Sequence, residues 1–95
     1  MPRRYRVVAA PAFEREVRRL RKRLPRVYES LLQAVELLET DPLNLEGRAD
    51  IRKLADVPSG EGQFRLRAGD YRLRYDVVGD DVVLHSMRPR GKAYR

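Results

Sequence analysis

Residues 64–75 read Phe64-Arg65-Leu66-Arg67-Ala68-Gly69-Asp70-Tyr71-Arg72-Leu73-Arg74-Tyr75. Apolar and arginine side chains alternate strictly on both sides of the Gly69-Asp70 pair. Successive side chains of a β-strand point to opposite faces, so this period of two indicates two strands, and the Gly-Asp pair between them indicates a tight turn. The stretch therefore predicts a β-hairpin with one apolar face directed at a core and one face that carries arginines.

The charged face of this hairpin carries four arginines, Arg65, Arg67, Arg72 and Arg74. Antiparallel pairing brings side chains on neighbouring strands close together, and like charges placed directly opposite each other destabilise the sheet. A row of guanidinium groups kept at that cost favours a polyanionic partner that supplies the missing negative charge. An ordinary solvated face is the alternative.

The composition is that of one small basic domain spanning residues 1–95. The formal net charge is +7, from 21 basic and 14 acidic residues, and the basic residues occur along the whole chain. Such a balance indicates a partner that carries phosphates or acidic side chains. With no cysteine and a single histidine, the chain offers no disulfide, no thiolate site and no histidine pair, so we expect neither a metal nor another cofactor.

Nothing in the sequence indicates a membrane or secretory protein. No apolar run approaches the roughly 20 residues that a membrane-spanning helix needs. The N-terminal residues 1–6 are basic, but only the short apolar run 7–10 follows them, so they do not form a secretory signal peptide. We therefore expect a cytoplasmic protein with no membrane partner.

The first half of the chain predicts a strand and two helices. Strand-forming residues fill positions 5–9. Pro11 suits the first position of a helix, and apolar residues then recur with helical spacing from Phe13 to Leu24. Pro25 interrupts that pattern, and a second helix follows that ends at 40–42. The predicted apolar stripe of this second helix is Val27, Tyr28, Leu31, Leu32, Val35 and Leu38.

The second half adds further strands to the hairpin. Residues 51–54 form a candidate short strand, the breaker-rich segment 56–62 forms a loop, and residues 82–87 form a last strand after a turn at 78–81. The order is β-α-α-β-β-β-β. Because two amphipathic helices must bury their apolar stripes against another element, we predict an α+β fold. In it, the helical hairpin packs on one face of a mostly antiparallel twisted sheet.

Several residues have both a structural and a functional interpretation. His85 lies among apolar residues, which favours a locally satisfied core or edge histidine over a catalytic one. Asp80-Asp81 follows a glycine and is interpreted as a turn rather than a metal site. Tyr71 and Tyr75 alternate with arginines as in an RNA-stacking platform, but they share the apolar face of the hairpin, which favours core packing. The basic residues of the first helix form either a solvated face or a contact with ribosomal RNA.

The element order and two short motifs resemble the RelE/ParE superfamily of toxins from bacterial type II toxin–antitoxin systems. The run from Leu66 to Tyr75 is similar to the family's R-x-G-x-Y-R-[ILV]-x-Y hairpin. Arg90 followed by Tyr94-Arg95 is similar to the family's C-terminal R-x-x-x-Y-R ending. The resemblance covers nearly the whole chain and implies a RelE-like fold.

The resemblance implies one of two actions. RelE-like members cut mRNA in the ribosomal A site without a metal, by attack of the ribose 2′-OH on the neighbouring phosphate. ParE-like members share the fold but inhibit DNA gyrase. Both kinds are neutralised by a cognate antitoxin, which often represses the shared operon.

The resemblance also implies catalytic roles for Arg72, Arg90 and Tyr94. Arg72 matches the arginine that contacts the scissile phosphate, Arg90 matches the basic residue of the C-terminal segment, and Tyr94 matches the tyrosine that is the candidate general acid/base. Arginine stays charged and binds phosphate bidentately, so it suits stabilisation of the transition state. An unperturbed tyrosine titrates near about 10, so Tyr94 would need nearby arginines to favour its phenolate. Packing against the sheet edge and stacking on a base are the alternatives for Tyr94.

Five further basic residues complete the candidate RNA- and phosphate-binding set, Arg65, Arg67, Arg74, Arg88 and Lys92. Arg65 and Arg67 match two positions where well-studied members carry lysine, whose pKa could fall more easily to serve a general base. Many relatives also have histidine before the C-terminal arginine, where this chain has Pro89. Both departures leave phosphate binding intact and put the cleavage rate in doubt.

The leading hypothesis is therefore a RelE-like toxin, a ribosome-dependent and metal-independent mRNA endoribonuclease that inhibits translation. Its expected partners are the ribosome, mRNA and an acidic, partly disordered antitoxin that folds as it binds. Operator DNA would be contacted only through the antitoxin. The alternatives are a ParE-like gyrase inhibitor and a catalytically weak relative that mainly binds an antitoxin.

Overall fold

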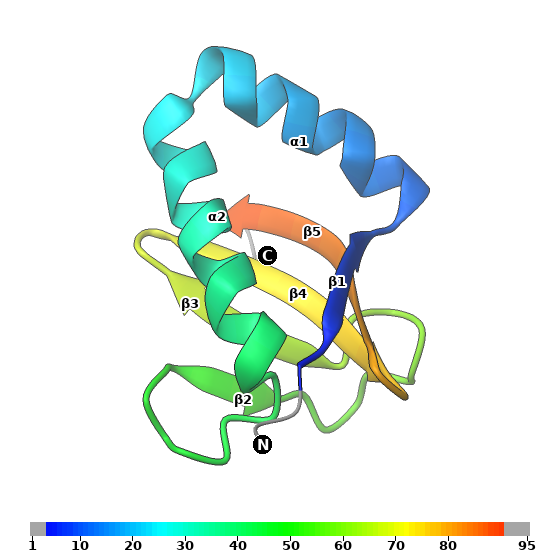
Figure 1. The fold of residues 1–95 in the computed structure, drawn as a ribbon. Helices are drawn as coiled ribbons and strands as arrows, with labels where there is room; N and C mark the ends of the chain where they lie inside the picture. Colours follow the sequence, from blue (N-terminus) through cyan, green and yellow to red (C-terminus); the bar gives the residue numbers. More distant parts are fainter. Residues whose placement is uncertain (1–3, 91–95) are drawn as a thin grey trace.

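The computed structural model describes residues 4–90, and its elements follow the predicted order β-α-α-β-β-β-β. Figure 1 shows their arrangement. The elements are β1 (Arg6–Ala9), α1 (Pro11–Arg23), α2 (Pro25–Thr40), β2 (Ile51–Lys53), β3 (Phe64–Ala68), β4 (Tyr71–Val78) and β5 (Asp81–Pro89).

The five strands form one mixed sheet in the order β1-β5-β4-β3-β2. β1 pairs parallel with β5, beginning with Arg6 opposite Asp81, and the other three pairings are antiparallel. The first strand of the chain therefore lies beside the last one (Figure 1). The prediction of a mostly antiparallel sheet is confirmed.

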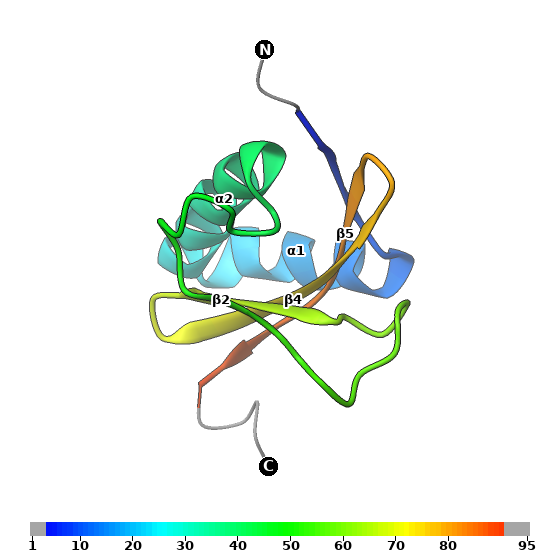
Figure 2. The same ribbon diagram turned by 90° about the horizontal axis from the view of Figure 1, so that it is seen from below.

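The two helices form a hairpin that covers one face of the sheet (Figure 2). Each helix begins with a proline, Pro11 or Pro25, at a position where the missing N–H has no intrahelical acceptor in any case. Only Leu24 separates the end of α1 from the start of α2. Within residues 4–90, no helix is long and apolar enough to cross a membrane.

The core lies between the helix pair and the apolar face of the sheet. Its buried members are Phe13 and Leu20 from α1, Leu31, Ala34 and Leu38 from α2, and Leu66, Leu73, Tyr75, Val82, Leu84 and Met87 from the strands. Tyr75 is completely buried, and its hydroxyl donates a 2.7 Å hydrogen bond to the carbonyl of Pro42. Burial and the nearby Asp41 charge raise the pKa of Tyr75 above the ordinary value for a phenol. Tyr75 is thus a core residue, as predicted, and no candidate acid or base.

Two predictions about the helical stripes are wrong. Leu24 is 45% exposed because it forms the junction between the helices rather than a fourth position of the α1 stripe. Leu32 is 48% exposed, whereas Ala34 is buried in its place. The stripe that meets the core therefore runs along Leu31, Ala34 and Leu38.

The predicted turn of the central hairpin is confirmed at Gly69-Asp70, between β3 and β4. Gly69 has a φ of +61°, which is the conformation that the first central residue of a type II′ turn adopts and that glycine adopts at no steric cost. The turn fixes the pairing of Ala68 with Tyr71 and of Arg67 with Arg72. It thereby places the arginines of both strands on the same face.

Candidate nucleic-acid interface

The face of the sheet opposite the helices carries two rows of arginines, which we call the arginine face. Directly paired residues of antiparallel strands point to the same side of a sheet. One row joins Arg67, Arg72 and Arg88 across β3, β4 and β5. The neighbouring row joins Arg52, Arg65 and Arg74 across β2, β3 and β4.

The arginines of this face are not equally accessible. Arg65 and Arg72 are each only 7% exposed, whereas the side chain of Arg67 is 42% exposed. The alternative of an ordinary solvated face therefore does not describe these two arginines. A buried guanidinium is held in a defined position, which suits a group that stabilises charge in a transition state.

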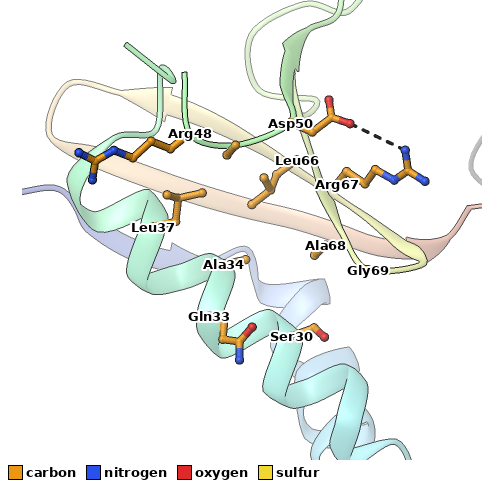
Figure 3. Close-up of a pocket in the computed structure, with 11 residues that line it drawn as sticks. Ser30, Gln33, Ala34, Leu37, Arg48, Asp50, Leu66, Arg67, Ala68 and Gly69 are labelled. Carbon is orange, nitrogen blue, oxygen red and sulfur yellow. Dashed lines mark ion pairs between the residues drawn. The ribbon is translucent and has the colours of Figure 1, made fainter. Parts of the chain in front are cut away.

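Part of the negative charge that the arginines need comes from the chain itself. The Asp50 carboxylate lies 3.0 Å from Nη2 of Arg65 and 4.0 Å from Nη1 of Arg67 (Figure 3 shows the latter pair). The Asp50 carbonyl also accepts a hydrogen bond from the N–H of Arg67. Asp50 thus occupies a position between two guanidinium groups, where the oxygens of a bound phosphate would compete with it.

A second carboxylate, Asp76, lies at the far end of the same face and holds the loop before β3. Asp76 is 1% exposed and accepts hydrogen bonds from the N–H groups of Gly60, Gly62 and Gln63, at 2.9 to 3.1 Å. His85 Nε2 lies 2.7 Å from the same carboxylate. Burial pushes the pKa of Asp76 upward, but the hydrogen bonds from Gln63, Gly62 and His85 outweigh it and hold this pKa below its usual value. An ionised carboxylate only accepts hydrogen bonds, so His85 Nε2 carries the proton in this contact.

His85 is therefore a locally satisfied histidine, as its sequence context predicts. It is brought to Asp76 by an irregularity in the β4–β5 register, where Arg74 pairs with Ser86 but Tyr75 pairs with Leu84. The extra residue in β5 turns His85 towards the arginine face. The partner of His85 could not be predicted, because the alternation of side chains does not reveal the bulge.

Arg74 binds the backbone carbonyl groups of the same loop. Its Nε and Nη2 atoms donate hydrogen bonds to the Gly62 carbonyl at 3.1 and 2.9 Å, and Nη2 also donates to the Glu61 carbonyl at 3.1 Å. Asp76 binds the N–H groups of this loop and Arg74 binds its carbonyls. Arg74 therefore has a structural role in addition to the phosphate binding predicted for it.

We predict that Gly62→Ala lowers the free energy of unfolding by more than Gly60→Ala does. Gly62 and Gly60 have positive φ angles of +83° and +100°. An alanine in this conformation destabilises the fold by about 1–2 kcal/mol in either variant. Only at Gly62 would the new Cβ meet another group, at 3.1 Å from Cβ of Arg74. Urea denaturation of the two variants measures the difference. Equal losses would show that the contact with Arg74 contributes nothing.

Arg88 and Arg90 lie where β5 leaves the sheet. Arg88 is exposed, and its Nη1 lies 3.0 Å from Oε1 of Glu16 on α1, so it ties the end of β5 to the helix layer. The N–H of Arg90 donates a 2.8 Å hydrogen bond to the carbonyl of Asp70 at the β3–β4 turn. The chain therefore enters its C-terminal segment beside the Arg67–Arg72–Arg88 row. Tyr94 and Lys92 lie outside the described residues, so their predicted roles stay predictions.

The described part of the site can bind and stabilise an anion, and it contains no obvious general base. Arginine is a poor proton acceptor, and the Nε2 atom of His85 is engaged by the Asp76 carboxylate. Asp80 lies in the turn after β4 as predicted, whereas Asp81 begins β5 and pairs with Arg6 at 3.0 Å. Among residues 4–90, no three histidine, cysteine, aspartate or glutamate side chains are grouped so as to hold a metal ion.

A second candidate site is a groove of about 370 Å³ between α2 and β3 (Figure 3). Its apolar lining comes from Ala34 and Leu37 on α2 and from Leu66 and Ala68 on β3. Ser30, Gln33, Arg48, Asp50 and Arg67 add polar groups around it. The groove therefore offers apolar contacts together with both signs of charge to a bound segment.

Comparison with known proteins identifies the family. The model of the family described as "ParE toxin of type II toxin-antitoxin system, parDE" matches residues 7–94, almost the whole chain. The chain belongs to this toxin family. The predicted membership of the RelE/ParE superfamily is thereby confirmed. No curated protein matches the chain.

Two solved structures have the same fold as this toxin. The chain of an archaeal RelE–RelB complex from Pyrococcus horikoshii OT3 is 27% identical, with a TM-score of 0.68 over 93% of this chain and 97% of that one. A RelB–RelE antitoxin–toxin complex from Methanococcus jannaschii contains a chain that is 23% identical, with a TM-score of 0.53 over 92% and 94%. The RelE-like fold is therefore confirmed, and both similar structures were determined as toxin–antitoxin complexes.

Asp50 and Asp76 are the residues of this site that sequence analysis missed. Asp76 interrupts a run of arginines on the charged face of β4, and a lone carboxylate there is a signal that could have been used. Asp50 carries no such signal, because its proximity to Arg65 and Arg67 depends on how β2 pairs with β3.

Proposed function

We propose that this toxin is a metal-independent endoribonuclease that cuts mRNA at the ribosome and so inhibits translation in the cytoplasm. The observation that carries the proposal is the Arg67–Arg72–Arg88 row, with Arg72 buried at its centre and the C-terminal segment starting beside it. Attack of a ribose 2′-OH on the adjacent phosphate builds negative charge on the phosphoryl oxygens. Fixed guanidinium groups stabilise that charge without having to reorganise.

The residues of the site would divide the chemistry between them. Arg72 would contact the scissile phosphate, and Arg67 and Arg65 would bind its neighbours after displacing Asp50. Arg74, Arg88, Arg90 and Lys92 would add positive charge around the strand. Tyr94 would remove the 2′ proton or protonate the leaving 5′ oxygen, a role supported by the resemblance of the C-terminal segment to the family ending.

A second candidate is inhibition of DNA gyrase, which the ParE description of the family model favours. Intramolecular contacts of Arg65, Arg74 and Arg88 also occupy part of the charge that a ribonuclease would use. A third candidate is a catalytically weak relative that acts mainly as the partner of an antitoxin.

We further propose that a RelB-type antitoxin neutralises this toxin and that operator DNA is contacted only through it. Support comes from the similar Pyrococcus horikoshii structure, which is a complex with RelB. An amphipathic acidic segment of the antitoxin fits the groove between α2 and β3, where apolar side chains are flanked by Arg48 and Arg67.

The proposal predicts growth arrest with ribosome-dependent mRNA cuts when the chain is expressed from a tightly controlled promoter. Mapping of mRNA 5′ ends detects the cuts, and a supercoiling assay with purified gyrase tests the second candidate. Tyr94→Phe should abolish the cuts, because it removes the only phenol that the proposal uses, whereas Tyr28→Phe on α2 is the matched control. Arrest with blocked supercoiling and intact mRNA would establish gyrase inhibition instead. Absence of both effects would identify the weak relative.

A further inference from the structure

The Asp50 carboxylate lies among the arginines to which the proposed function assigns neighbouring phosphates of the strand. Its oxygens are 3.0 Å from Nη2 of Arg65 and 4.0 Å from Nη1 of Arg67 (Figure 3 shows the latter pair). A carboxylate and a phosphodiester group each share one negative charge between two oxygens, and a guanidinium group binds both by charge-assisted hydrogen bonds. Asp50 therefore occupies, within the folded chain, the place that a backbone phosphate of a bound strand would take.

The backbone holds Asp50 in this place. Asn44 Nδ2 donates a 2.9 Å hydrogen bond to the carbonyl of Ala49, whose N–H donates a 3.2 Å hydrogen bond to Asn44 Oδ1. The next carbonyl, that of Asp50, accepts a 3.0 Å hydrogen bond from the N–H of Arg67. The loop that ends at Asp50 is thus closed on itself and joined to β3. The contact between Asp50 and the arginines follows from the fold rather than from the chance position of a long surface side chain.

The two partners of the shorter ion pair differ in their freedom to move. The side chain of Arg65 is 9% exposed, whereas that of Asp50 is 46% exposed. Burial fixes the guanidinium group, but the carboxylate can rotate into solvent about the side-chain torsions of the aspartate, with no shift of the backbone. Binding of a phosphate to Arg65 would therefore exchange one anion for another at a cation that stays in place.

This exchange weakens the binding of phosphate. A phosphate that contacts Arg65 gains a charge-assisted hydrogen bond, but the hydrogen bond between Arg65 and Asp50 is lost at the same time. The displaced carboxylate stays near the strand and repels its phosphates. Asp50 thus lowers the affinity of both Arg65 and Arg67 for a strand, and further contacts are needed to hold that strand on the arginine face.

We propose that Asp50 is a specificity-determining residue, which weakens the binding of free RNA and so reserves the arginine face for mRNA that the ribosome already holds. The inference rests on the proposed function, because it requires that the arginine face binds phosphates. A strand held by the ribosome meets a ribosome-bound toxin at a high effective concentration, so a moderate loss of affinity does not prevent its binding. Free RNA lacks this advantage and depends on the affinity of the arginines alone.

The test compares the full chain with three variants. Asp50→Asn keeps the size of the side chain and removes its charge, whereas Asp50→Glu keeps the charge. Glu36→Gln is the matched control, because Glu36 is exposed on α2, in the layer that covers the opposite face of the sheet, and its loss changes the net charge by the same amount. The probe is a fluorescein-labelled strand of about six nucleotides of 2′-O-methyl RNA. This strand has no free 2′-OH on its riboses and so cannot be cut by the proposed reaction.

Fluorescence anisotropy measures the affinity for this strand at salt concentrations from about 50 to about 200 mM. We expect Asp50→Asn to bind the strand about tenfold more tightly than the wild type does, because phosphate no longer competes with a charged acceptor. The logarithm of its affinity should fall more steeply with the logarithm of the salt concentration, by about 0.7 for each additional phosphate contact. Asp50→Glu and Glu36→Gln should stay close to the wild type in both respects.

Circular dichroism melting curves show whether each variant is folded, and Asp50→Ser replaces Asp50→Asn if that variant does not fold. Equal gains in Asp50→Asn and Glu36→Gln would mean that net charge alone sets the affinity and would overturn the proposal. An unchanged or weaker affinity of a folded Asp50→Asn would also overturn it, because Asp50 would then position the arginines rather than compete for them. If neither the wild type nor any variant binds the strand, the arginine face does not bind phosphates, and the proposed function fails together with the inference.

Discussion

Asp76→Ala is expected to lower the free energy of unfolding by about 3–5 kcal/mol, because several hydrogen-bond donors would lose a charged acceptor, at about 1–3 kcal/mol for each buried one. Asp76 is 1% exposed and accepts hydrogen bonds from three backbone N–H groups of the 60–63 segment, and from His85. Alanine would leave these donors without their acceptor and would release the loop that Arg74 also holds. Urea denaturation followed by circular dichroism measures the loss. Asp81→Ala is the control, because its pair with Arg6 is exposed to solvent and should contribute little to stability.

The same carboxylate makes stability depend on pH in the acid range. The pKa of Asp76 is lower in the folded protein than in the unfolded chain, because donated hydrogen bonds outweigh the opposing effect of burial. Its contribution is therefore fully present above the unfolded value of about 3.9 and is lost as the pH falls through the folded pKa. Asp76→Asn cannot titrate, so its stability should change less steeply than that of the wild type below about pH 4. If the free energy of unfolding falls equally steeply in both proteins below about pH 4, the role given to Asp76 is wrong.

Arg72→Ala is expected to slow ribosome-dependent mRNA cleavage by about 10²–10³-fold, the usual effect of removing one fixed donor to a developing oxyanion. Arg72 is the central residue of its row, between Arg67 and Arg88, and is only 7% exposed. Arg72→Lys keeps the charge but cannot bind a phosphate bidentately, so we expect a cleavage rate between those of the wild type and Arg72→Ala. Single-turnover cleavage on programmed ribosomes measures these rates.

The control for Arg72 is Arg52→Ala, on the exposed edge strand β2 and in the neighbouring row. It should cut mRNA at nearly the wild-type rate. Because Arg72 is buried, the melting temperature of each variant is measured in parallel. If Arg72→Ala loses stability and antitoxin affinity but still cuts at the wild-type rate, Arg72 is a structural residue and the phosphate contact must be made elsewhere.

Local patterns in the sequence predicted the fold, because each of its elements is specified by neighbouring residues. The alternation from Phe64 to Tyr75 set the faces of β3 and β4, and Gly69 set the turn between them. Pro11 and Pro25 marked the starts of both helices. The exposure of Leu32 was not predictable in this way, because helical spacing alone does not say whether Leu32 or Ala34 meets the sheet.

Of the candidate site, only the arginines could be predicted from the sequence. Arg65 and Arg72 were expected on one face, and the register confirms that position. Their burial and the pairing of Arg65 with Asp50 depend on which segments cross the sheet beside them, and these lie about 15 residues or more apart in the chain. The contact between Asp76 and His85 depends in addition on the bulge in β5.

The parallel pairing of β1 with β5 has a consequence for the order of events during synthesis. β1 leaves the ribosome first, and its partner strand is made only when the chain has reached Asp81. The row of Arg67, Arg72 and Arg88 is likewise incomplete until β5 has paired with β4. A nascent chain therefore carries both helices and the central hairpin before it has a finished arginine face.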